Sequence, residues 1–163
     1  MLYSTSVKTP LGTFRISCDD TGLTEIILPN SNCNAKENET TKIKETPPLL
    51  KRATKQISEY CKGRRTIFDL PLSVNGTIFQ QQVWDIIRHI PYGQTMSYGE
   101  IARQLGSTGK ARAVGGAANA NPLPLVIPCH RVIGSNGTLT GFAGGIEFKE
   151  RLLNLEKNIL NNS

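Results

Sequence analysis

The residues best suited to chemistry in this sequence are a cysteine and a histidine in direct succession, Cys129 and His130, followed by Arg131. A thiolate is a strong nucleophile, and a neighbouring cation lowers the pKa of a thiol toward that reactive form. The alternative for Cys129 is a small buried hydrophobic residue, because that is what most free cysteines are. The remaining cysteines lack such surroundings, and we interpret them as structural or incidental: Cys18, Cys33 and Cys61.

The segment before this cysteine, residues 121–128, contains three prolines among apolar residues. A residue that precedes proline avoids the helical region, so we expect extended backbone at Asn121, Leu123 and Ile127. Side chains of adjacent residues in extended backbone point to opposite faces. A water or a turn would therefore have to connect Cys129 with His130, and His130 would need an orienting partner from elsewhere in the chain.

Two short helices are predicted ahead of that segment. Ser97 and Glu100 form a capping box that starts the first helix, and Gly106 suits its C-terminal cap. The second helix is expected over residues 110–120. Two short helices joined by a tight turn resemble a helix-turn-helix, although many helical hairpins bind nothing.

The second of these helices consists almost wholly of small residues, with Arg112 as its one long side chain. Gly115 and Gly116 weaken a helix by about 1 kcal/mol each relative to alanine. Close packing on a neighbouring helix would explain them, and so would close approach to a DNA backbone. From Arg88 to Arg131 five basic residues stand against one acidic residue, and the formal net charge of the chain is +6. This charge favours a polyanionic partner but equally fits a solvated basic face.

The first half of the chain is typical of a small α+β unit. A helix is predicted from Pro47-Pro48 to Gly63, after a polar stretch at residues 30–46 that is interpreted as an exposed loop. We expect a last strand over Thr66–Leu70. Three β-prone runs separated by turn signals predict an antiparallel meander: Leu2–Val7, Thr13–Ser17 and Leu23–Leu28.

A linker is expected over Pro71–Gly76, and the predicted domains are therefore residues 1–72 and 73–163. Thr77 is suited to cap a helix that ends before Pro91. The sequence has no apolar run long enough for a membrane span and no secretion signal, so we expect a cytoplasmic protein with reduced thiols. It has no CxxC pair and only two histidines, so zinc would need scattered ligands. We expect neither a metal nor a cofactor.

The second half closely resembles the O6-alkylguanine-DNA alkyltransferase family, the methylated-DNA–protein-cysteine methyltransferases. The resemblance extends from Ile78 to Glu156, about half of the chain. It implies an α+β protein, with a ribonuclease-H-like N-terminal sheet and helix followed by a mostly helical DNA-binding domain with a helix-turn-helix. The matching blocks follow the family's order and spacing: Ile90-Pro-Tyr-Gly-Gln-Thr, Ser97-Tyr-Gly-Glu-Ile-Ala, Ala111-Arg-Ala-Val-Gly-Gly-Ala, Asn121-Pro, Ile127-Pro-Cys-His-Arg-Val and Gly141-Phe-Ala-Gly-Gly.

The resemblance implies repair of duplex DNA in which O6-alkylguanine is flipped through the minor groove and its alkyl group moves once, irreversibly, to Cys129. His130 would act as a base through a water, and Glu156 would orient it. Asn121 would hold the turn that shapes the site, and Tyr98 would hydrogen-bond the guanine. Arg112 would fill the gap in the duplex. Further implied DNA contacts are Ala111, Gly115, Gly116, Ala118 and Arg131, and the implied base pocket is Val132, Phe142, Ala143 and Gly144.

The sequence departs from vertebrate members at Phe142 and Ala143, where those members carry a tyrosine and a serine. A main-chain amide donor survives that change, but a serine hydroxyl contact would not. We expect a monomer that binds duplex DNA and no membrane. The alternatives are a damage-binding relative without transfer, a helix-turn-helix regulator with an incidental cysteine, and a cysteine hydrolase using Cys129, His130 and Glu156. The cysteine in the acceptor position argues against the first of these.

Overall fold

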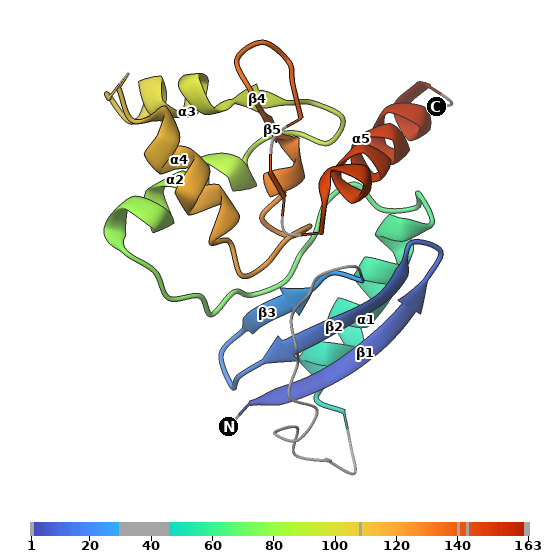
Figure 1. The fold of residues 1–163 in the computed structure, drawn as a ribbon. Helices are drawn as coiled ribbons and strands as arrows, with labels where there is room; N and C mark the ends of the chain where they lie inside the picture. The colour runs from blue at the N-terminus through green and yellow to red at the C-terminus, as the bar shows by residue number, and fades with distance from the viewer. Residues whose placement is uncertain (1, 30–45, 108, 140, 143, 162–163) are drawn as a thin grey trace. The chain divides into compact units, whose positions relative to one another are not determined.

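The computed structural model describes residues 2–29, 46–107, 109–139, 141–142 and 144–161. The chain forms two compact units, Met1–Val74 and Asn75–Ser163 (Figure 1). The first unit holds the sheet, and the second holds most of the helices together with Cys129.

The first unit is an antiparallel sheet of three strands in the order β1-β2-β3, covered by a helix (Figure 1). From Phe14 onward every second residue of β2 is buried, as the two-residue period of a strand requires. Helix α1 presents Leu50, Ala53, Ile57 and Tyr60 to the same core. The predicted meander and helix are therefore confirmed, with bounds β1 Tyr3–Thr9, β2 Gly12–Cys18, β3 Leu23–Ile27 and α1 Pro48–Cys61.

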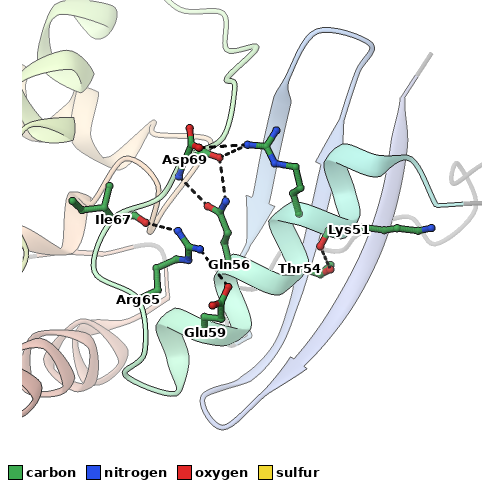
Figure 2. Close-up of polar contacts among 8 residues, drawn as sticks. Lys51, Thr54, Gln56, Glu59, Arg65, Ile67 and Asp69 are labelled. Carbon is green, nitrogen blue, oxygen red and sulfur yellow. Dashed lines mark hydrogen bonds and ion pairs between the residues drawn. The ribbon is translucent and has the colours of Figure 1, made fainter.

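The strand predicted over Thr66–Leu70 is wrong, because a side chain of α1 binds the backbone that a strand would use (Figure 2). The buried Gln56 accepts a hydrogen bond from the Asp69 amide at 2.9 Å and donates one to the Asp69 carbonyl at 3.1 Å. Arg52 donates to that carbonyl as well, at 2.8 Å. Both polar groups of Asp69 are thus engaged without a neighbouring strand.

Residues 71–73 pair with the edge of the sheet at Leu23, shortly after Asp69. The amide of Leu23 donates to the Pro71 carbonyl at 2.9 Å, and the amide of Ser73 donates to the Leu23 carbonyl at 2.8 Å. Leu72 forms a parallel bridge with Leu23. The chain therefore leaves the sheet after Ser73, later than the start of the predicted linker at Pro71.

The second unit begins with helix α2, Ile78–Arg88, which is followed by α3, Tyr98–Gln104, and α4, Ala111–Asn119. Thr77 caps α2 in a capping box with Gln80, and Ser97 caps α3 in a capping box with Glu100. Both predicted N-terminal caps are confirmed. Each box satisfies backbone donors that the first turn of a helix leaves free.

Helices α2 and α3 both pack on α4 through apolar side chains. The indole of Trp84 in α2 also donates a hydrogen bond to the Ala117 carbonyl of α4, at 2.8 Å. A short parallel pair of strands, β4 Met96–Ser97 and β5 Val132–Ile133, connects the start of α3 to the segment that follows Cys129. Helix α5, Ile146–Asn161, completes this unit. The predicted α+β fold class is confirmed.

Within the described residues no helix has the length and apolar character needed to cross a bilayer.

Candidate active site

Cys129 begins a short 3-10 helix, Cys129–Arg131, that follows a turn held by Asn121. The side-chain Nδ2 of Asn121 donates to the Ile127 carbonyl at 2.7 Å. Its side-chain oxygen accepts a hydrogen bond from the backbone amide of Leu123 at 2.9 Å. The backbone turns back here, because the Ile127 amide donates to the Leu123 carbonyl at 2.8 Å. Asn121 therefore fixes both ends of the turn that leads into the cysteine.

The prediction of extended backbone concerns Asn121, Leu123 and Ile127, and the turn forms between the last two of these residues. The proline rule constrains only residues that precede a proline, and Leu125 does not precede one. Leu125 adopts a φ of 76°, which lets the chain reverse. Cys129 and His130 both lie in a 3-10 helix, so the opposite-face placement expected for extended backbone does not apply to them.

A buried carboxylate, Glu156 of α5, joins the two residues after the cysteine. His130 Nε2 lies 2.6 Å from Glu156 Oε2. Arg131 donates through Nε to Oε1 at 2.9 Å and through Nη2 to Oε2 at 3.0 Å. The Gly93 amide donates to Oε1 at 3.0 Å. The structure thus brings Glu156 to His130 across 26 residues of sequence.

The charges of this network follow from its burial and hydrogen bonds. Burial opposes ionisation of Glu156, but the hydrogen bonds from His130 and Arg131 and the guanidinium charge favour the carboxylate, and its pKa is lowered to about 2. Burial lowers the pKa of His130, against the opposing effect of Glu156. We therefore assign a carboxylate at Glu156 and a neutral imidazole at His130. Since Nε2 then donates to the carboxylate, Nδ1 carries the basic lone pair.

Burial raises the pKa of the Cys129 thiol to about 11, against smaller opposing effects that include the Asn121 amide and the Lys149 charge. The residue is 9% exposed. The free protein thus holds Cys129 mainly as a thiol at neutral pH, and a base is needed to generate the nucleophile.

Lys149 of α5 is a candidate site residue that the sequence analysis missed. It is fully buried, and Nζ donates to the Val132 carbonyl at 2.5 Å. Burial lowers the pKa of Lys149, and the negative charge of a Cys129 thiolate would partly oppose that effect. On a helix whose polar side chains mostly face solvent, nothing in the residue type distinguishes a lysine that points inward.

A cavity of about 20 Å³ reaches Cys129, large enough for about one water. It adjoins an open groove of about 400 Å³ along α4, because Tyr98, Asn119 and Gly141 line both. The remaining residues of the cavity wall are Ala118, Asn121, Pro124 and Phe142, and those of the groove are Ala111, Arg112, Gly115, Gly116 and Ser135.

The placement of the predicted DNA contacts divides them into two groups. Ala111, Arg112, Gly115 and Gly116 line the groove. Arg131 does not: it is 6% exposed, and its guanidinium is bound to Glu156 and to the Ile90 carbonyl, the latter at 2.8 Å. The guanidinium of Arg131 thus points into the protein rather than into the groove, and the DNA contact predicted for Arg131 stays a prediction.

The other predicted residues lie as follows. Ala118 is buried and lines the cavity rather than the groove, and the DNA contact predicted for it stays a prediction. Val132 is buried, with its carbonyl on Lys149. Phe142 lines the cavity and Gly144 is buried. Ala143 lies outside the described residues. Asn119, at the junction of the groove and the cavity, was not predicted as a site residue.

This combination of a two-unit fold and a buried thiol beside a groove matches one class of protein. Residues 78–158 match the family model described as 6-O-methylguanine DNA methyltransferase, DNA binding domain. Residues 2–74 match the model of the ribonuclease-like domain of the same methyltransferases.

Individual relatives agree with that class. The chain is 46% identical over 160 residues to the constitutive methylated-DNA–protein-cysteine methyltransferase of Bacillus subtilis, covering 96% of each. It is 41% identical over 157 residues to the methyltransferase of Mycolicibacterium paratuberculosis, covering 96% of this chain and 93% of that one. The crystal structure of Mycobacterium tuberculosis OGT in complex with DNA superposes with a TM-score of 0.85 at 40% identity, covering 96% and 94%.

The chain therefore belongs to the methylated-DNA–protein-cysteine methyltransferase family, and the resemblance noted in the sequence is confirmed.

Proposed function

We propose that this protein repairs duplex DNA by moving the alkyl group on O6 of guanine to Sγ of Cys129, once per molecule. The observation that carries the proposal is the cavity at Cys129 that adjoins the groove along α4. Because this cavity shares wall residues with the groove, the Cys129 thiol lies beside a surface from which a base that has left the duplex would approach it. Membership of the family supplies the class of reaction.

The transfer is a displacement at saturated carbon. The thiol proton passes through a water to Nδ1 of His130, and the thiolate attacks the alkyl carbon. The S–C bond forms as the bond from carbon to O6 breaks, and the electron pair of that bond stays on guanine. Tyr98, which lines both the cavity and the groove, donates a proton to the departing base. The thioether has no good leaving group, so the cysteine is not regenerated.

Lys149 supports this chemistry as a buried cation near Cys129. Its charge favours the thiolate over the thiol, which offsets part of the effect of burial. Glu156 holds His130 with Nε2 protonated, so that the basic lone pair is on Nδ1. Asn121 holds the turn that places Cys129 at the cavity wall.

Base flipping through the minor groove is part of the proposal. A methylated guanine is unreachable inside the stack, and extrusion costs a few kcal/mol, less for a poorly paired base. Helices α3 and α4 would act as a helix-turn-helix with α4 on the DNA. The small residues Gly115 and Gly116 allow close approach in a narrow groove, and exposed Arg112 would occupy the vacated position. Action as a monomer in the cytoplasm belongs to the same proposal.

The direct test is the mass of the intact protein after incubation with excess duplex that carries O6-methylguanine. We expect a gain of one CH2 per chain, because methyl replaces the thiol proton, and no further gain with time. Cys129→Ser and Cys129→Ala should gain nothing. Unchanged mass with retained binding would instead indicate a damage-recognition module, and repeated turnover of thioesters would indicate a hydrolase.

A further inference from the structure

Arg131 makes hydrogen bonds inside the protein through all three of its nitrogen atoms. Nε and Nη2 each donate a hydrogen bond to one oxygen of Glu156, and Nη1 donates to the Ile90 carbonyl at 2.8 Å. The guanidinium also stacks over the ring of Tyr92, 5.6 Å from its centroid. Such a bidentate interaction fixes both the position and the plane of a carboxylate, which a lysine cannot do.

The hydrogen-bond acceptor positions of the Glu156 carboxylate are correspondingly occupied. Oε1 accepts from Arg131 Nε and from the Gly93 amide, and Oε2 accepts from Arg131 Nη2 and from His130 Nε2. A carboxylate offers about four acceptor positions, so these donors occupy all of them. A proton on Glu156 would have to displace one of these donors. Glu156 can therefore orient His130 but is poorly placed to take a proton from it.

We propose that Arg131 is a positioning residue that balances the charge of Glu156 and thereby sets the basicity of His130. An unbalanced carboxylate 2.6 Å from the imidazole would favour imidazolium and remove the base. With the guanidinium on the same carboxylate, His130 faces a nearly neutral pair and stays an unprotonated base. The proposal rests on the proposed function, in which His130 accepts the thiol proton.

The titratable and charged groups around His130 come from three elements. Glu156 and Lys149 belong to α5, and Cys129 and Arg131 belong to the 3-10 helix. Tyr92 lies in the turn after α2 and contacts Arg131. Lys149 acts in the same direction as Arg131, since its charge also disfavours imidazolium. Of these two cations, Arg131 hydrogen-bonds the carboxylate that binds His130, whereas Lys149 donates to the Val132 carbonyl.

The test is the pH profile of the single-turnover rate of Cys129 methylation with an O6-methylguanine duplex. Below the pKa of His130 the base is protonated and the rate falls. We expect Arg131→Gln to move this acid limb upward by about 1 to 3 pH units, the usual effect of an uncompensated opposite charge at this range. Arg131→Lys keeps the positive charge but loses the paired hydrogen bonds to Glu156. Its methylation rate should therefore fall, while its acid limb remains near the original pH. An acid limb at the same pH in all three proteins would overturn the proposal.

A second set of variants removes dependence on the folding of Arg131→Gln. Glu156→Gln alone leaves the Arg131 charge unbalanced, so the acid limb should move to lower pH. Combining it with Arg131→Met makes the pair neutral, and the limb should return toward its original position. If the acid limb of the pH profile lies at its original pH both in Glu156→Gln and in the double variant, the role of Arg131 is refuted. Absence of methylation in the unmodified protein would instead refute the proposed function.

Discussion

The change Glu156→Gln tests the buried network through stability as well as through activity. The side chain is fully buried and accepts hydrogen bonds from Gly93, His130 and Arg131. Glutamine has the same shape but offers one acceptor oxygen in place of two, and its NH2 group faces donors. It also leaves the Arg131 guanidinium buried without its counter-charge, and breaking a buried pair costs about 3 to 5 kcal/mol.

The pKa of Glu156 gives an independent magnitude. Lowering it from 4.5 to about 2 corresponds to about 3 kcal/mol of stabilisation at neutral pH. Since the pKa is lower in the folded protein, this stability is present above the unfolded pKa and is lost as pH falls toward 2. We therefore expect Glu156→Gln to lower the free energy of unfolding by about 3 kcal/mol at pH 7 and by much less near pH 3.

Urea denaturation of both proteins between pH 7 and pH 3 measures this difference. Glu150→Gln is the matched control, because Glu150 is exposed on the same helix. It should change the free energy of unfolding by no more than about 0.5 kcal/mol at any pH. A loss for Glu156→Gln that equals the control, or that does not shrink as pH falls, would refute the account of Glu156 as a buried, paired carboxylate.

Three further changes test other parts of the site. Asn121→Ala removes two hydrogen bonds and should cost about 2 kcal/mol in urea denaturation; an unchanged midpoint would show that the turn does not depend on Asn121. Arg112→Ala should weaken binding to an O6-methylguanine duplex in a titration, while its free energy of unfolding changes by no more than about 0.5 kcal/mol. Arg103 is also exposed, and Arg103→Ala should weaken binding less. Equal losses of affinity in the two variants would contradict the role of Arg112. Lys149→Met should slow methylation about tenfold at pH 7, because the lost cation no longer favours the Cys129 thiolate. The rate should recover at higher pH, and a uniform loss at every pH would contradict this role of Lys149.

Local sequence signals predicted the elements that local chemistry determines. The capping boxes at Thr77 and Ser97 bind backbone within their own first turns, so sequence alone locates both helix starts. The Thr66–Leu70 strand was wrong for the opposite reason. Whether Asp69 pairs with a strand or with Gln56 depends on a side chain 13 residues away, and no local pattern encodes that contact.

The same limit applies to the site. Arg131 follows a reactive cysteine in a basic region, and the sequence pattern gives no sign that its guanidinium points inward. The role of Glu156 entered through the family resemblance rather than through spacing, because its partner lies 26 residues away. Lys149 went unnoticed because lysine on an amphipathic helix ordinarily marks the solvent side. Burial, which decides all three cases, is a property of the packed chain.

The central claim is that one particular sulfur, Sγ of Cys129, accepts the alkyl group. The most direct measurement is peptide mapping by tandem mass spectrometry after incubation with an O6-methylguanine duplex. The account predicts an S-methyl group on the peptide that contains Cys129 and on no other cysteine peptide. A methyl group on Cys18, Cys33 or Cys61, or an unmodified Cys129 after complete repair of the duplex, would contradict it.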